Sequence, residues 1–222
     1  DLDDTLWAFS LNARDTYEEM YWKYGYDRYF DSFEHYYSLY QRRNLDLWAE
    51  YADGKVTKEE LNRQRYLYPL EAVGAGDSTL AKAYERDALT MIPTKSKLMP
   101  HAREVLEYLS RKYNLYILSN GFKELQSHKM RSSGIDEYFK KVVLSDDIGI
   151  LKPWPEIFHF ALSTTQSELN NSLMIGDSWE NDIVGAAGVG MHQVFYNLSG
   201  RIDLPFAPTY QITDLKDLFN FL

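Results

Sequence analysis

The chain has 222 residues, of which 45% are apolar, and carries a net charge of −9. A chain of this size can bury a full hydrophobic core in one large domain or two small ones. Its negative charge argues against nucleic acid as a partner, because phosphate backbones require basic surfaces, and no apolar run approaches the roughly 18 residues of a membrane span. Cysteine is absent, which excludes disulfides, thiol nucleophiles and thiolate metal sites and fits a cytoplasmic location.

The chain opens on an acidic segment, Asp1-Leu2-Asp3-Asp4-Thr5. Taken alone, this segment fits a solvated acidic stretch. It does not fit an EF-hand calcium loop, because such a loop needs glycine at its sixth position and glutamate at its twelfth, where this chain has Leu6 and Asn12. The function of these carboxylates therefore depends on what the rest of the chain brings to them.

Residues 10–90 show only helical patterns, with large apolar and aromatic side chains, mostly tyrosine, at the i, i+3, i+4, i+7 spacing over residues 17–24 and again over 33–40. Thr57 starts a capping box ahead of a third helix, and Ser78 is predicted to cap a fourth. This segment holds 12 of the 18 tyrosines. Aromatic residues at this spacing form a core more often than a binding site, although a few could stack on a pyrimidine base.

From about residue 98 onward, short apolar runs alternate with helical patterns; the runs are residues 115–118, 142–144, 173–175 and 194–196. Short strands separated by helices of about 10–15 residues favour a parallel sheet with helices on both faces. We therefore predict an α/β fold. Its Rossmann-like parallel core comprises residues 1–9 and 91–222, and residues 10–90 form an inserted helical domain.

Polar residues follow these runs, at the edge of a parallel sheet where ligands bind. Ser119 and Asn120 follow the first run, Lys152 comes a loop after the second, and Asp177 follows the third, with Asp182 five residues later. Taken individually, Ser119 and Asn120 also fit a turn, Lys152 fits a surface lysine, and Asp177 fits a helix cap. Their common place at strand ends makes them candidates for one site.

Each of these groups has a use in phosphoryl transfer. One carboxylate can attack phosphorus and form an aspartyl-phosphate, and a second can protonate the leaving oxygen and later activate water. Aspartate oxygens together with a backbone carbonyl suit Mg²⁺. A lysine and a hydroxyl would neutralise the charge that develops on the transferring group. The five histidines show no metal-ligand spacing, so we do not expect a zinc site.

The set Asp1-x-Asp3-x-Thr5, Ser119, Lys152 and Gly176-Asp177-x4-Asp182 resembles the haloacid dehalogenase superfamily in its order and separations, over nearly the whole chain. The resemblance implies that Asp1 is the nucleophile and Asp3 the general acid and base. It implies that Ser119, Asn120 and Lys152 hold the phosphoryl group, and that Lys152 is also a catalytic residue. Mg²⁺ would bind Asp1, the backbone carbonyl of Asp3 and Asp177, while Asp182 orients other groups. Residues 10–90 would be a helical cap of the C1 type that selects the substrate.

A finer resemblance is to the YjjG-type pyrimidine 5′-nucleotidases. It is carried by Ser119-Asn120-Gly121-Phe122, Glu124, Gln126, Lys129, Ser133-Gly134-Ile135, Gly149, Lys152-Pro153 and Pro155-x-Ile157-Phe158. It implies a small phosphorylated metabolite, a nucleoside 5′-monophosphate, as substrate. The alternatives are a sugar-phosphate or phosphoglycolate phosphatase, a phosphomutase, and a non-catalytic binding module of the same fold. A dehalogenase is disfavoured, because its chemistry needs neither Mg²⁺ nor Asp3.

The chain departs from the superfamily pattern in two places. The superfamily has an apolar strand ahead of the first aspartate, and this sequence starts at Asp1. We expect that strand to lie in residues that precede Asp1; without it the chain would fold poorly or leave a gap in the sheet. Trp154 and Trp179 stand beside the lysine and aspartate motifs, where smaller polar residues are common. They are expected to shape the entrance to the site or to pack.

Overall fold

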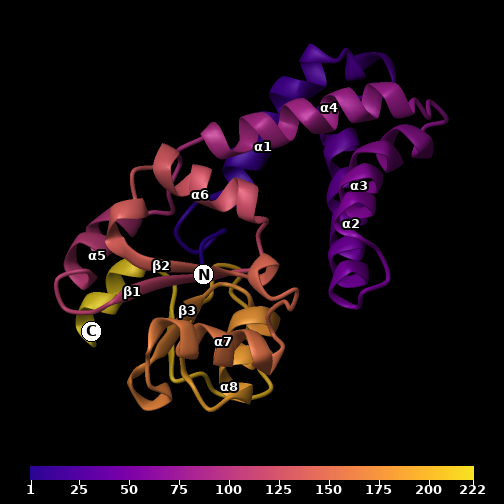
Figure 1. Cartoon of the computed structure of the whole chain (residues 1–222). Helices are drawn as coiled ribbons and strands as arrows, with labels where there is room; N and C mark the ends of the chain where they lie inside the picture. Colours follow the sequence, from indigo (N-terminus) through magenta and orange to yellow (C-terminus); the bar gives the residue numbers. More distant parts are fainter. The chain divides into compact units, whose positions relative to one another are not determined.

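The computed structural model describes residues 1–222, which divide into two compact units (Figure 1). One unit combines Asp1–Phe9 with Ser96–Leu222, and the other is Ser10–Lys95. The boundary predicted at residue 90 falls inside helix α4 (Ser78–Met91). The helix continues past this point, and Ile92 just beyond it is buried as well, so the chain leaves the helical unit only after Lys95.

The helical unit contains α1 (Phe9–Lys23), α2 (Phe33–Ala52), α3 (Lys58–Ala72) and α4, with α3 packed against both α2 and α4 (Figure 1). Thr57 caps α3 as predicted, since its hydroxyl accepts from the Glu60 N–H. The cap predicted for α4 is wrong by one residue. The Asp77 carboxylate accepts from the N–H groups of Thr79 and Leu80, so Asp77 and not Ser78 is the cap.

The aromatic stripes of this unit form its core. Eight tyrosine side chains are buried there: Tyr17, Tyr21, Tyr26, Tyr36, Tyr37, Tyr40, Tyr66 and Tyr84. Several of their hydroxyl groups find partners inside the core, because a buried polar group without a hydrogen bond is costly. The Tyr17 and Tyr40 hydroxyls are 2.6 Å apart, and the Tyr84 hydroxyl donates to the Tyr17 carbonyl over 3.0 Å. Burial raises the pKa of Tyr17 well above its ordinary value.

The other unit alternates strands and helices, as the apolar runs predicted. Its strands are β1 (Leu115–Ser119), β2 (Phe139–Leu144), β3 (Leu173–Gly176), β4 (His192–Tyr196) and β5 (Tyr210–Ile212), and every pairing is parallel. The helices are α5 (Ala102–Leu109), α6 (Lys123–Ser132), α7 (Pro155–Thr165) and α8 (Gly185–Gly188), with a π-helical turn at Trp179–Val184. The edge strand β5 was not predicted, because only three residues pair there.

Alternate residues of β3 face two separate cores, which is the pattern of a sheet covered on both faces. Met174 packs with Ile157 and Phe158 of α7, whereas the flanking Ile175 packs against the cluster that contains Val105 of α5. Short strands of this kind place their carboxyl ends, and the loops that follow, at one edge of the sheet.

None of the helices combines the length and apolar character needed to cross a membrane.

The parallel strands form two sheets, β1-β2 and β3-β4-β5. Asp1 lies at the interruption: its main-chain nitrogen donates to the Ile175 carbonyl of β3 over 2.8 Å. The Lys152 ammonium, which bonds the Asp1 carboxylate, also donates to the Leu118 carbonyl of β1. Asp1 therefore stands between the carboxyl ends of β1 and β3.

Candidate active site

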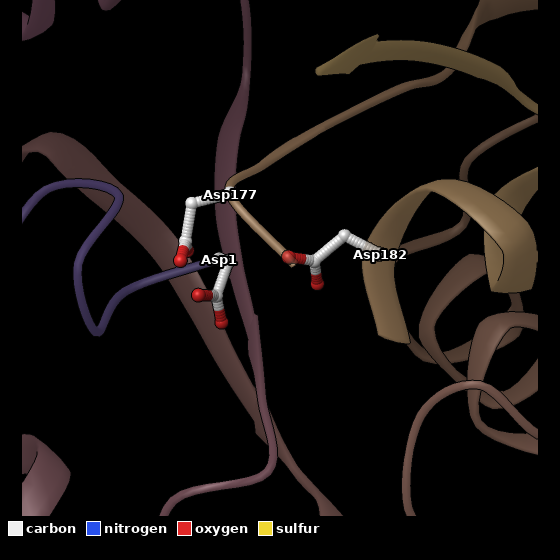
Figure 2. A group of neighbouring side chains, drawn as sticks. All are labelled: Asp1, Asp177 and Asp182. Carbon is white, nitrogen blue, oxygen red and sulfur yellow. The ribbon is translucent and has the colours of Figure 1, made fainter. Parts of the chain in front are cut away.

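Three carboxylates meet at this edge. Asp1, Asp177 directly after β3 and Asp182 in the π-helical turn each offer an oxygen, and these oxygens lie within 4.8 Å of one another. Figure 2 shows the three side chains converging, with Asp182 reaching in from the helical side. Like charges this close repel strongly unless cations offset them. The arrangement therefore requires positive charge from the protein or from a bound metal.

Lys152 supplies part of that charge from inside the protein. Its side chain is only 3% exposed, and its ammonium donates to Asp1 Oδ1 over 2.8 Å, to Asp182 Oδ1 over 2.6 Å and to the Leu118 carbonyl over 3.0 Å. All three N–H donors of the lysine are thus used. The ammonium fixes one oxygen of Asp1 and leaves Asp1 Oδ2 to other partners.

Asn120 holds the backbone that carries Lys152. Its Oδ1 accepts from the Lys152 main-chain N–H over 2.8 Å, and its Nδ2 donates to the Lys152 carbonyl over 3.0 Å. This paired bond orients the lysine loop relative to the end of β1. The structure thus gives the Asn120 side chain a structural role, and phosphate binding by Asn120 stays a prediction.

Thr5 links Asp177 to the first segment. Its hydroxyl donates to Asp177 Oδ1 over 2.8 Å and accepts from the Asp177 main-chain N–H over 3.2 Å. The same hydroxyl lies 3.3 Å from Asp1 Oδ2, but its single proton serves the shorter contact. Burial, with the negative charge of Asp182 second, raises the pKa of Asp177 to about 6.

Asp182 differs from the other two carboxylates, because both of its oxygens have protein partners. Oδ1 accepts from Lys152, and Oδ2 accepts from the Ser178 main-chain N–H over 3.1 Å. A side chain on Gly176 would place its Cβ 2.1 Å from Asp182 Oδ2, so glycine is required there. Asp182 is therefore suited to orienting Lys152, which is the kind of role that the resemblance implies.

The remaining oxygens suit a hard divalent cation. One oxygen of Asp1 lies in the acidic group with Asp177, and Mg²⁺ prefers carboxylate oxygens together with water as ligands. The donor set contains oxygen only, and the raised pKa of Asp177 reflects burial and neighbouring negative charge that a bound cation would offset. The residues present thus fit Mg²⁺, with Asp1 and Asp177 as side-chain ligands. The predicted third ligand, the Asp3 carbonyl, stays a prediction.

The Asp3 side chain lies outside the acidic group. Its carboxylate accepts from the Lys129 ammonium over 2.8 and 2.9 Å and from Gln126 Nε2 over 3.0 Å. Lys129 is 2% exposed, and its ammonium lies 4.9 Å from the centre of the Trp7 ring and 5.0 Å from that of Phe9. Asp1 and Asp3 are two residues apart, yet they sit in different electrostatic surroundings, which is the basis for assigning them different chemical tasks.

Ser119 ends β1 with its side chain buried. Its Oγ accepts from Gln126 Nε2 over 2.7 Å and from the Gly121 N–H over 3.1 Å. Gln126 and Lys129 were part of the finer resemblance, but no role was predicted for either. The available signal was their spacing of three in a helix that follows Ser119, which places both side chains on one face of α6.

The two tryptophans differ in their surroundings. Trp154 is 56% exposed, whereas Trp179 is buried and packs on Phe195 and Phe206, with ring centroids 5.2 and 4.9 Å away. Trp179 is therefore a core residue that follows the Asp177 loop.

The chain thus combines a parallel α/β core and an inserted helical unit with carboxylates and a buried lysine at the strand ends, a set of groups suited to an enzyme with a carboxylate nucleophile. The sequence profile of the haloacid dehalogenase-like hydrolases matches residues 1–190, and the chain belongs to this family.

Relatives extend over the full length of the chain. It is 28% identical to the pyrimidine 5′-nucleotidase YjjG of Escherichia coli, over 100% of this chain and 95% of that protein. It is also 28% identical to the phosphoserine phosphatase of Thermus thermophilus, over 99% of this chain and 96% of that one. The magnesium-bound crystal structure of the putative HAD-hydrolase YfnB from Bacillus subtilis matches with a TM-score of 0.89 and 26% identity, covering 100% and 96% of the two chains.

Proposed function

We propose that this hydrolase is a Mg²⁺-dependent phosphatase that cleaves phosphate monoesters through an aspartyl-phosphate on Asp1. The observation that carries the proposal is the position of Asp1. Lys152 fixes its Oδ1, and the carboxylate lies in the acidic group beside Asp177. One carboxylate is thereby both oriented for attack and placed next to the site that fits the metal.

The side chains of the site account for both halves of the reaction. A carboxylate oxygen of Asp1 attacks phosphorus, the bond from phosphorus to the ester oxygen breaks, and the departing alkoxide takes a proton from the protonated form of Asp3, which is left ionised. Asp3 then removes a proton from water, whose oxygen attacks phosphorus and releases Asp1. Mg²⁺, when bound by Asp1 and Asp177, would neutralise phosphoryl charge. Ser119 donates a hydrogen bond to a phosphoryl oxygen, and Lys152 keeps Asp1 oriented.

We propose a pyrimidine nucleoside 5′-monophosphate as the substrate and the Ser10–Lys95 unit as the part that selects it. Similarity to the pyrimidine 5′-nucleotidase over the whole chain supports this choice. Similarity to a phosphoserine phosphatase at the same identity keeps an amino-acid phosphate as the second candidate. A sugar phosphate and phosphoglycolate are the further alternatives.

With Mg²⁺ present, kcat/KM for uridine 5′-monophosphate is expected to exceed that for glucose 6-phosphate, phosphoglycolate and phosphoserine by about tenfold or more, the range that one or two specific contacts supply. The measurement is phosphate release across this panel. A preference for any of the other three would reject the nucleotide assignment. Isomer formation without phosphate release would indicate a mutase, and no turnover even of p-nitrophenyl phosphate would indicate a binding module.

The metal requirement should depend on pH through Asp177. Because its pKa is raised to about 6, the carboxyl is protonated below that pH and must lose its proton before it binds Mg²⁺. The apparent affinity for Mg²⁺ is therefore expected to be constant above about pH 7 and to fall by up to about tenfold per pH unit well below pH 6. Calorimetric titration with Mg²⁺ at pH values of about 5, 6 and 7.5 measures this; equal affinities would contradict it.

A further inference from the structure

Two residues with separate tasks in the proposed reaction share one neighbour. The Nε2 of Gln126 donates to Ser119 Oγ over 2.7 Å and to Asp3 Oδ2 over 3.0 Å. Gln126 lies on α6 and its side chain is completely buried. The phosphate-binding serine and the acid/base aspartate are therefore connected through a single carboxamide.

The orientation of this carboxamide follows from its partners. An ionised carboxylate can only accept hydrogen bonds, and Asp3 pairs in that form with the Lys129 ammonium. The amide group that faces Asp3 must then be the NH₂ and not the carbonyl oxygen. One N–H points to Asp3 and the other to Ser119, so both donors are used. The carbonyl oxygen Oε1 is buried without a partner, a cost that the two donated bonds offset.

The orientation of Gln126 in turn fixes the Ser119 hydroxyl. A hydroxyl oxygen has two lone pairs, and Ser119 Oγ accepts from Gln126 and from the Gly121 N–H. Its own proton cannot point toward either donor. It is left to donate in a third direction, which is what a group that stabilises a phosphoryl oxygen has to do.

The backbone next to Ser119 is shaped around Gln126. A Cβ added at Gly121 would lie 2.1 Å from Gln126 Nε2 and 2.4 Å from its Cδ. Any residue other than glycine would displace the carboxamide from Ser119 and Asp3. The close approach of this carboxamide therefore requires glycine at 121.

We propose that Gln126 is a positioning residue that holds Ser119 as a hydrogen-bond donor to phosphate and keeps Asp3 in place for proton transfer. The inference rests on the proposed phosphatase function, and it identifies Gln126 as the residue that links phosphate binding by Ser119 to proton transfer by Asp3. Gln126 does not touch the substrate; it acts through the two side chains that it orients.

The test is Gln126→Glu, which keeps the size of the side chain and replaces the donor with an acceptor. Ser119 would turn its proton toward the introduced carboxylate, and Asp3 would face a second negative charge. Binding of inorganic phosphate with Mg²⁺ present, measured by calorimetry, is expected to weaken about tenfold, the loss of one hydrogen bond to a charged group. Turnover of an alkyl phosphate should fall more than that of p-nitrophenyl phosphate, whose leaving group needs no proton.

Three comparisons separate positioning from a merely structural role. Gln211→Glu, the same exchange at an exposed site in β5, should behave like the wild type. Gly121→Ala, which leaves Gln126 in the sequence but displaces it, should weaken phosphate binding in the same direction. In a Ser119→Ala background, Gln126→Glu should cost little further phosphate affinity, because the shared hydroxyl is already absent.

A folded Gln126→Glu protein that binds phosphate as tightly as the wild type and keeps the same ratio of alkyl to aryl turnover would overturn the inference. Failure of the proposed function would look different: the wild type itself would release no phosphate from any monoester. Phosphate calorimetry would still measure the effect of Gln126 on Ser119 in that case.

Discussion

Asp1→Asn is expected to abolish phosphate release while the fold stays intact. An amide oxygen is too weak a nucleophile to attack phosphorus, and without the covalent intermediate the loss should reach at least about 10⁴-fold in kcat. The fold should tolerate the change, because Lys152 keeps the Asp182 carboxylate as its counter-ion. Mass spectrometry after acid quenching should detect a phosphorylated chain in the wild type and none in the variant.

Asp136→Asn provides a matched control, because it makes the same exchange at an exposed position outside the site. This control should keep activity close to that of the wild type. If Asp1→Asn retained substantial turnover, Asp1 would not be the nucleophile.

Lys152→Met is expected to reduce both activity and stability. Methionine has a similar volume but no charge, so the buried Asp182 and the nearly buried Asp1 would lose their shared counter-ion. Removing one partner of a buried ion pair costs about 3–5 kcal/mol, and loss of an oriented group at the reacting centre costs about 10²–10³-fold in kcat. Urea unfolding without metal and turnover with saturating Mg²⁺ measure the two effects separately.

Lys140→Met, an exposed lysine on β2, serves as the control and should change neither quantity appreciably. Mg²⁺ should restore part of the lost stability of Lys152→Met, because a cation bound to the folded state offsets the same carboxylates. A Lys152→Met protein as stable and as active as the control would show that Lys152 neither stabilises the buried carboxylates nor orients Asp1.

Much of the core could be predicted from the sequence, because its signals are local. The apolar runs at 115–118 and 173–175 are strands, and the polar residues directly after them lie at one edge for a topological reason. Asp177 and Ser119 could thus be found without knowing any contact. The order of the motifs along the chain then sufficed to indicate the family.

The partners of Asp3 could not be predicted in the same way. Whether Lys129 reaches Asp3 depends on how α6 is rotated about its own axis, and a shift of one residue turns a helix by about 100°. That rotation is set by packing between segments that are 126 positions apart. The predicted cap of α4 was wrong for a local reason. Asp77 and Ser78 are both residue types that cap helices well, and only the extended backbone of Asp77 distinguishes them.

The sequence separations within the site have a consequence for synthesis. Asp1 draws its bonds from Ile175 and Lys152, which follow it by 174 and 151 positions. At roughly 5–20 residues per second, a ribosome exposes Asp1 for about 10–35 s before Asp177 is made. The compact Ser10–Lys95 unit is made within that interval. The proposed nucleophile is thus made early but is among the last residues to reach its place, and newly acquired activity would report that the chain has been made at least as far as Asp182.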